Sequence, residues 1–416
     1  MAKRKIPTIV FVIILILSII ALDIARQVQF GGSKDDIILS VLYTSEKKGW
    51  INSIAPDFPE WFAERNPGQS VRLKFEVQGT RTSMLSILSG ESKPTVWSPA
   101  AMVWVPLLDW AWNNKFGTQI LDYGQVISLV ASPIVIGTWQ SYMEDNNFTS
   151  WSDLYDLADT ELKLAHTSAQ ESNSGYMAVL LEITAASGKQ PHEITLEDLQ
   201  NTTIQSWLEK VESKAVLYGT STGFLAKQAV QLGPSAINVM ILYENLIIET
   251  AKDGEAFSKW GDNLVAVYPE EGTLWSDHPF AILNASWVTP EEQFAAQEFE
   301  TFLLSKENQQ QAVPFGFRPG NETLLNDTDI IQEMQEVFKP ANGVAFNLTI
   351  PRFDVPTDGE ILDRIPDLWL KTRATTLERV EGSEYWQIGM NPLIYFSLIF
   401  GTLTILVIVR KKRRVN

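Results

Sequence analysis

The sequence predicts an α/β protein held between two membrane-spanning helices. Between about residues 37 and 304, short aliphatic runs alternate with helical patterns, which is typical of a sheet covered by helices. Uncharged apolar runs occupy residues 6–22 and 392–409, close to the two ends of the chain. Of the 416 residues, 45% are hydrophobic, so the chain can bury a sizeable core and is not disordered throughout.

The composition excludes several kinds of site. The chain has no cysteine, which rules out disulfides, thiolate zinc sites, iron–sulfur clusters and cysteine nucleophiles. His166, His192 and His278 are far apart in the sequence, and we expect neither a metal site nor a cofactor. The excess of 50 acidic over 33 basic residues argues against a nucleic-acid partner. We recognise no arrangement of catalytic residues, so we expect no enzymatic activity.

Both apolar runs are close to the roughly 20 residues that a helix needs to cross the hydrocarbon core. Basic residues precede the first run and follow the second, so the positive-inside rule places both termini in the cytoplasm. The run 6–22 is alternatively a cleaved signal peptide, but cleavage after Ala25 puts Asp23 where a small residue is needed. We therefore predict a protein of the cell membrane with an external domain.

The external part is expected to span residues 36–370, joined to the membrane by tethers at 23–35 and 371–389. The basic tail 410–416 also suits contact with anionic lipid. Six Asn-x-Ser/Thr sequences are possible glycosylation sites of an external domain: Asn147, Asn201, Asn284, Asn321, Asn326 and Asn347.

The first part of the external domain contains three predicted strands. Aliphatic runs at 37–43, 71–77 and 95–97 are bounded by Gly, Pro or Ser residues, as strands usually are. Helical patterns at 49–66 and 83–88 lie between them.

The pattern continues through the rest of the domain. The apolar run 127–137 is interrupted by Ser132-Pro133, which predicts two strand pieces with a bend. Thr289-Pro290 supplies a cap and a first-turn proline for a helix over 291–304. The remaining expected elements are strands at 162–166, 239–243 and 264–268 and a helix at 175–187.

Polar side chains follow the predicted strands. In open α/β sheets, ligands bind beyond the carboxyl ends of the strands, where helix N-termini offer free N–H groups. Each hydroxyl is alternatively an ordinary helix cap. The residues concerned are Thr44, Ser45, Thr80, Arg81, Ser98, Ser132 and Thr167. Two further groups precede predicted helices: Ser172, Asn173, Ser174 and Gly175, and then Thr220, Ser221 and Thr222.

Several short segments, in order, resemble the extracellular solute-binding proteins of the type II periplasmic-binding fold, in particular the molybdate- and sulfate-binder branch. The similarity extends over about residues 37–320. The segments that carry it are Trp97–Ala100, Ala165–Gly175, Thr220–Phe224, Gly233–Ser235, Tyr243–Asn245, Tyr268-Pro269, Ser276–Pro279 and Gly316–Pro319.

This resemblance implies two lobes that close on a ligand between them. Lobe 1 would comprise about residues 36–130 and 277–370, and lobe 2 about 131–276. Tyr243 is similar to the tyrosine that reaches the ligand in oxyanion binders, and joins the polar groups above as a predicted ligand contact. Glu244 is either a contact for a cation or a ligand amine, or a solvated or hinge carboxylate. The implied ligand is a small polar or anionic solute.

Two functions are compatible with this resemblance. The first is capture of a solute outside the membrane for an ABC permease and its ATPase, which are encoded elsewhere. The second is a ligand sensor or surface assembly protein with the same fold, which the presence of two membrane anchors favours.

The topology can be tested in intact cells. Protease added outside should remove the middle of the chain, while epitope tags at both termini stay protected because the basic flanks hold them inside. Digestion of a C-terminal tag would contradict this topology, and a mature N-terminus near residue 26 would identify run 6–22 as a signal peptide.

Overall fold

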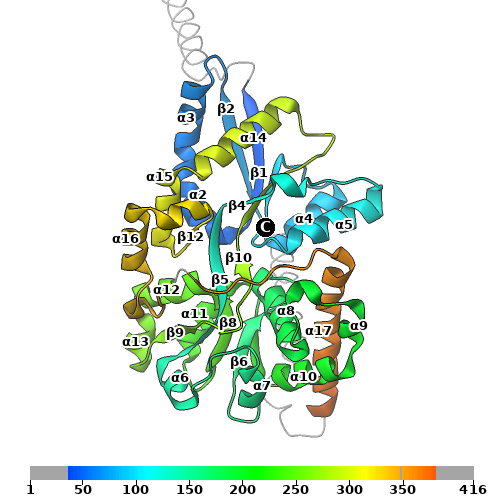
Figure 1. The fold of residues 1–416 in the computed structure, drawn as a ribbon, viewed down its shortest axis with the longest axis vertical. Coiled ribbons are helices and arrows are strands. Elements are labelled where there is room, and N and C mark those ends of the chain that lie inside the picture. The colour runs from blue at the N-terminus through cyan, green and yellow to red at the C-terminus, as the bar shows by residue number, and fades with distance from the viewer. Residues whose placement is uncertain (1–35, 347–348, 381–416) are drawn as a thin grey trace, which may run out of the picture.

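A computed structural model describes residues 36–346 and 349–380 (Figure 1). The apolar runs 6–22 and 392–409, the basic tail and Asn347 lie outside these ranges. Among the described residues, no helix combines the length and the apolar character that crossing a membrane requires. Two α/β lobes are joined by extended segments, which confirms the predicted α/β class and its two lobes.

Lobe 1 is built on a five-stranded sheet in the order β2-β1-β3-β11-β4. The first three strands along the chain pair in parallel, and β11 is antiparallel to its neighbours. The strands are β1 (Ile37–Tyr43), β2 (Val71–Val77), β3 (Val96–Ser98), β4 (Ile127–Ser128) and β11 (Pro279–Ile282).

Helices cover both faces of this sheet. Successive side chains of β1 point to opposite faces, so both faces present apolar groups to the helices. Leu39, Val41 and Tyr43 belong to an aromatic core on one face, whereas Leu42 belongs to the core on the other. Against the first face pack α2 (Lys48–Ile54), α3 (Phe58–Arg65) and α14 (Pro290–Leu303), and against the second α4 (Thr80–Ser89) and α5 (Trp104–Phe116).

Lobe 2 is built on a second sheet, in which β10-β5-β8-β6-β7 are neighbours and β9 and β12 also pair with β5. The central β5 is buried along its whole length, so its ten residues are largely apolar. The strands are β5 (Val130–Trp139), β6 (Leu164–Thr167), β7 (Ala215–Gly219), β8 (Val239–Tyr243), β9 (Leu264–Val267), β10 (Trp275–Ser276) and β12 (Arg318–Pro319).

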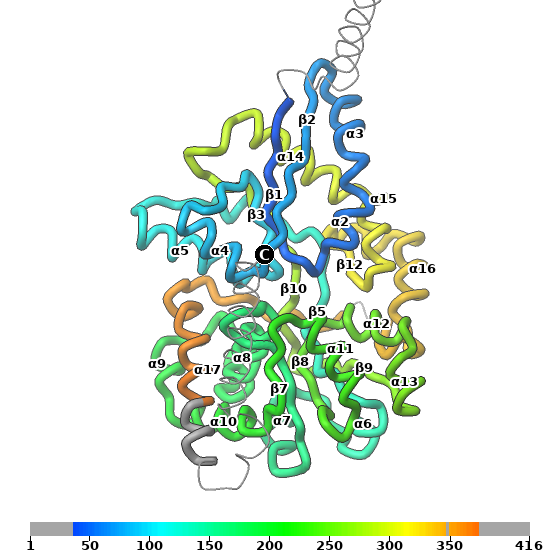
Figure 2. Tube along the Cα trace, turned by 180° about the vertical axis from the view of Figure 1, so that it is seen from behind, coloured from blue at the N-terminus to red at the C-terminus, as the bar shows by residue number. Residues whose placement is uncertain are grey.

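The helices of lobe 2 surround this sheet (Figures 1 and 2). The central α8 is buried over its first twelve residues and therefore lacks a polar face there. The helices are α6 (Gln140–Asn146), α7 (Asp153–Leu157), α8 (Asn173–Ser187), α9 (Leu196–Gln200), α10 (Thr202–Glu212), α11 (Thr222–Leu232), α12 (Glu244–Asp253) and α13 (Glu255–Trp260). Later in the chain, α15 (Lys306–Gln310) packs on α14 of lobe 1, and α16 (Thr328–Val337) follows it.

The last described helix, α17 (Gly359–Val380), contacts both lobes. It packs on α8, α9 and α10 of lobe 2 and on α5 of lobe 1, and the phenol of Tyr176 donates a hydrogen bond of 2.7 Å to the carbonyl of Leu362. From the sequence, we expect this segment to lie partly in lobe 1 and partly in the tether 371–389. In the structure, the helix continues to Val380.

The expected helix over 49–66 is interrupted. It consists of α2, a 3-10 turn (Ala55–Asp57) and α3, because Pro56 and Pro59 cannot donate the backbone hydrogen bonds of a continuous helix. By contrast, β1, β2 and β8 have the bounds that their aliphatic runs predict.

A buried ion pair joins β12 to the start of α12. Arg318 of β12 donates from Nε and Nη2 to the two carboxylate oxygens of Glu244, at 2.8 and 2.7 Å. The phenol of Tyr268 donates to the same carboxylate at 2.5 Å. Both side chains of the pair are almost fully buried, so Glu244 is not a solvated carboxylate.

We expect Glu244→Gln to lower the free energy of unfolding by about 3–5 kcal/mol, because it leaves the guanidinium of Arg318 buried without its counter-charge. Urea denaturation measures this change. The matched control is Glu360→Gln, since Glu360 forms an exposed pair with Arg364 and should contribute less than about 1 kcal/mol. Equal effects of the two substitutions would contradict the structural role of the buried pair.

Candidate functional site

Three predicted hydroxyl groups of lobe 2 meet at one point. Thr167 ends β6, Ser174 lies in the first turn of α8, and Thr222 begins α11. Their hydroxyl oxygens form a chain, with 2.7 Å between Thr167 and Ser174 and 2.7 Å between Ser174 and Thr222. The three are buried, so the ends of parallel strands and the starts of two helices gather neutral donors and acceptors in one place.

Asn173 and Tyr243 extend this cluster toward lobe 1. The amide nitrogen of Asn173 donates to the phenol oxygen of Tyr243 at 2.9 Å. Its amide oxygen accepts from the indole nitrogen of Trp104 at 2.6 Å, and Trp104 belongs to α5 of lobe 1. Burial, followed by the nearby carboxylate of Glu46, raises the pKa of Tyr243, so its phenol stays neutral.

Lobe 1 contributes two polar atoms with unused hydrogen-bonding capacity. Ser98 ends β3, and its hydroxyl is buried with no hydrogen-bond partner among the described residues. One carboxylate oxygen of Glu46, just after β1, is likewise buried and lacks a partner within the described part of the chain. The Glu46 carboxylate lies near enough to Tyr243 of lobe 2 to affect its pKa, so another molecule between the lobes can supply the missing partner. Ser98 instead borders a small cavity of about 10 Å³ inside lobe 1, beside Phe75 and Phe299 of the aromatic core.

A buried lysine lies beneath these groups. The ammonium of Lys47 donates to the carbonyls of Ser98 and Pro99 at 2.9 and 3.2 Å, and to the hydroxyl of Thr44 at 3.1 Å. It also contacts Nδ1 of His278 at 3.3 Å. Burial lowers the pKa of Lys47 to about 7, against the opposing effect of Glu46. Lys47 thus holds the strand ends of lobe 1 in place.

We call the set Glu46, Asn173, Ser174, Thr222 and Tyr243 the interlobe site. Four of the five are predicted from the sequence, whereas the predicted Ser98 lies outside the set. Glu46 is missed, together with Lys47 and Trp104. A signal for Lys47 exists in its position three residues after Thr44, within reach of the strand end, but a lysine in that position is usually exposed.

Other predicted contacts have structural partners or are exposed. Thr80 accepts from the backbone N–H of Ala100 at 3.2 Å, and Ser132 accepts from that of Asn245 at 3.1 Å. Ser172 occupies the cap position of α8 without a capping hydrogen bond from its side chain. Ser45, Thr220 and Ser221 are exposed, and Arg81 is half-buried on the side of lobe 1 that faces Tyr176.

Gly175 is required by packing. A β-carbon at this position would lie 1.9 Å from the carbonyl oxygen of Thr167. The absence of a side chain therefore lets α8 begin directly against the end of β6. We infer that its place in the polar segment reflects this close approach.

The segment Gly219–Gly223 has the Gly-x-Ser-x-Gly spacing of a hydrolase nucleophile elbow, and it lies between a strand and a helix. This spacing is not among the patterns that we recognise from the sequence above. In such an elbow the serine occupies a strained turn. Ser221 is instead extended, with φ −149° and ψ 156°, and its hydroxyl caps α11 by accepting from the N–H of Phe224. The geometry is that of a helix cap.

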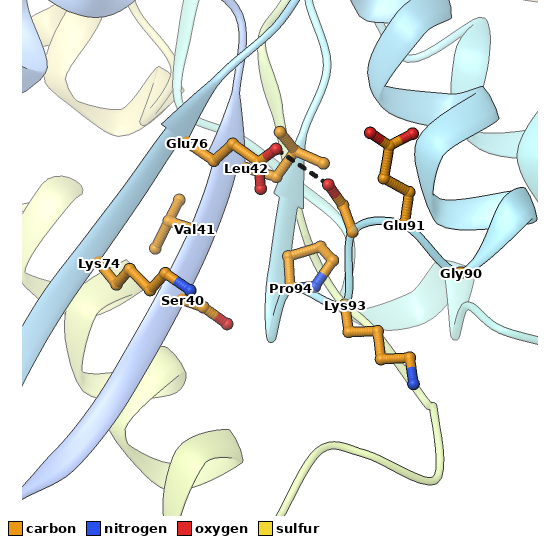
Figure 3. A pocket seen from close by; sticks show the side chains of 10 residues that line it. Ser40, Val41, Leu42, Lys74, Glu76, Gly90, Glu91, Lys93 and Pro94 are labelled. Carbon is orange, nitrogen blue, oxygen red and sulfur yellow. Dashed lines mark hydrogen bonds between the residues drawn. The ribbon is translucent and has the colours of Figure 1, made fainter.

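A separate hollow of about 410 Å³ lies in lobe 1, away from these strand ends (Figure 3). It is lined by residues of β1 and β2 and by the loop before β3, where Ser92 donates to Glu76 at 2.9 Å. Its lining carries both signs of charge, with Lys74, Lys93 and Glu91 around the opening (Figure 3). None of its lining residues belongs to the interlobe site.

Solved structures with the same fold come from several bacteria. The periplasmic binding protein AfuA of Actinobacillus pleuropneumoniae, solved with fructose 6-phosphate, is 16% identical with a TM-score of 0.54, covering 82% of this chain and 99% of that one. The ferric binding protein of Campylobacter jejuni is 14% identical with a TM-score of 0.53, covering 80% and 99%. At these identities, the likeness shows the fold.

The family assignment comes from the sequence. No curated protein matches the chain significantly. The family model described as bacterial extracellular solute-binding protein matches residues 39–318, about two thirds of the chain. This range begins in β1, ends in β12, and contains every residue of the interlobe site. The chain therefore belongs to the bacterial extracellular solute-binding protein family.

Proposed function

We propose that this protein is a membrane-anchored receptor that captures a small polar solute in the interlobe site and delivers it to an ABC-type permease. One observation carries the proposal. The unused carboxylate oxygen of Glu46 comes from lobe 1, while neutral hydroxyls and an amide come from lobe 2. A ligand held by both sides stabilises the closed arrangement through contacts that separated lobes cannot make.

The polar groups also indicate the chemistry of the solute. A carboxylate such as Glu46 only accepts hydrogen bonds, whereas hydroxyl groups both donate and accept. The solute should therefore offer at least one donor to Glu46 and several acceptors to the hydroxyls of lobe 2. A sugar or hydroxy acid, with or without an anionic group, fits this requirement better than an oxyanion without protons.

A sensor remains the second candidate, because α17 contacts both lobes and leads toward the C-terminal apolar run. A change in the relative position of the lobes would then change the contacts of α17, which would connect the lobes to the membrane segment. Deleting the gene separates the two functions once a ligand is known. Loss of uptake supports the receptor, and retained uptake with a lost response supports the sensor.

We expect Glu46→Gln to weaken ligand binding by about 1–3 kcal/mol without lowering the melting temperature of the ligand-free protein. The buried carboxylate oxygen has no partner to lose among the described residues, so only the liganded state needs it. Ser174→Ala should weaken binding similarly but also lower the melting temperature, because Ser174 has two buried hydrogen bonds. A thermal-shift screen of sugars, sugar phosphates, hydroxy acids, sulfate and molybdate supplies the ligand, and calorimetry measures the affinities.

The control is Ser258→Ala, since Ser258 is exposed on α13 and should change neither quantity. Unchanged affinity in both Glu46→Gln and Ser174→Ala would place the ligand elsewhere. Tight binding of molybdate, with no sugar or hydroxy acid bound, would contradict the proposed class of solute.

A further inference from the structure

A second polar cluster lies inside lobe 2, apart from the interlobe site. His166 comes from β6, Glu182 from α8 and Glu212 from α10, and all three side chains are buried. The imidazole nitrogen and carboxylate oxygens that they offer lie within 4.8 Å of one another. Because charged residues are rarely buried without a counter-charge, this arrangement requires an explanation.

The hydrogen bonds around His166 leave one ring nitrogen directed into the cluster. Its Nδ1 lies 2.8 Å from the carbonyl oxygen of Thr167, which can only accept, so Nδ1 carries a proton. Its Nε2 lies 3.1 Å from a carboxylate oxygen of Glu212. The phenol of Tyr218 donates to the other oxygen of Glu212. Outer partners thus orient both residues toward a common centre.

The carboxylate of Glu182 independently indicates that a proton or a cation is missing from the cluster. Both of its carboxylate oxygens are buried, and neither has a hydrogen-bond partner among the described residues. The inward atoms of the three side chains therefore all bear lone pairs. They can coexist only if protons or a cation lie between them, and one divalent cation would balance the charge of two carboxylates.

Protons are the competing explanation. Burial, followed by the charge of Glu212, raises the pKa of Glu182 well above its usual value. Without a cation, a neutral Glu182 can donate its proton to Glu212. An experiment must therefore distinguish a shared proton from a metal ion.

We propose that His166, Glu182 and Glu212 bind one divalent cation of the zinc type. Zn²⁺ accepts imidazole nitrogen and carboxylate oxygen at about 2.0–2.2 Å, which places ligand atoms about 3.4 Å apart in tetrahedral geometry. The present ligand atoms lie within 4.8 Å of one another, and the pair His166–Glu212 is already 3.1 Å apart, so small side-chain movements would bring the set to that spacing. This site is not indicated by the sequence, in which the three residues are widely separated.

The position of the site explains what a bound cation would do. His166 directly precedes Thr167, and Glu182 lies on the helix that begins with Asn173 and Ser174. A cation would thus tie β6, α8 and α10 together beneath the interlobe site. The indole of Trp369 on α17 covers the cluster, with its ring centroid 6.1 Å from that of His166. The buried site would exchange its cation slowly and fill as lobe 2 folds.

The test uses the purified full chain, produced with ZnCl₂ in the medium and dialysed against buffer that removes loosely bound metal. We expect one zinc per chain by elemental analysis. We also expect X-ray absorption of the bound zinc to show one imidazole with oxygen ligands. Glu182→Gln should lower zinc affinity by at least about 100-fold, because it removes a ligand. It should still fold, because an amide has the shape of the neutral carboxyl group.

The matched control is Glu197→Gln, an exposed glutamate of α9, which should retain one zinc per chain. Less than stoichiometric zinc in the wild-type chain would overturn the proposal in favour of the shared proton. Equal zinc in all three proteins, or a coordination sphere without imidazole, would overturn it in favour of binding elsewhere. The absorption measurement decides even if Glu182→Gln fails to fold.

Discussion

The side-chain amide of Asn173 is the contact on which the arrangement of the two lobes depends. An amide can accept and donate at the same time, and here it accepts from Trp104 of lobe 1 while it donates to Tyr243 of lobe 2. The ring of Trp104 also packs on Tyr176, 4.9 Å away between centroids, one turn along the same helix. An aspartate could not donate to Tyr243, and it would add a negative charge near Glu46. The start of α8 therefore belongs both to the interlobe site and to the contact between the lobes.

The strands were predictable because their environment is simple. The runs at 37–43 and 239–243 are aliphatic and lie in sheets covered on both faces, so burial alone gives each run its pattern and length. The hydroxyls of Thr167, Ser174 and Thr222 were predictable because strand ends and helix starts meet at one edge of a sheet. Helix α5 was not predicted, since its Trp residues and Pro106 obscure the helical pattern.

The rest of the site depends on tertiary contacts that sequence patterns do not contain. Lys47 is buried because its ammonium contacts two backbone carbonyls, the hydroxyl of Thr44 and the imidazole of His278, which directly precedes β11. Nothing local distinguishes it from Lys48, which is exposed. Glu46 gains its significance from Tyr243, almost two hundred residues away and in the other lobe. The cluster around His166 likewise combines residues from a strand and two helices.

The helix α17 determines where a water-soluble fragment of this protein can end. A cut at residue 370, the domain boundary expected from the sequence, would divide the helix just after Trp369. It would remove Arg373, whose guanidinium lies 4.0 Å from the ring centroid of Tyr218 and 4.6 Å from that of Trp369. It would also remove the buried Thr372. Recombinant fragments intended for crystallisation should therefore extend to at least Val380, with the apolar run 392–409 removed.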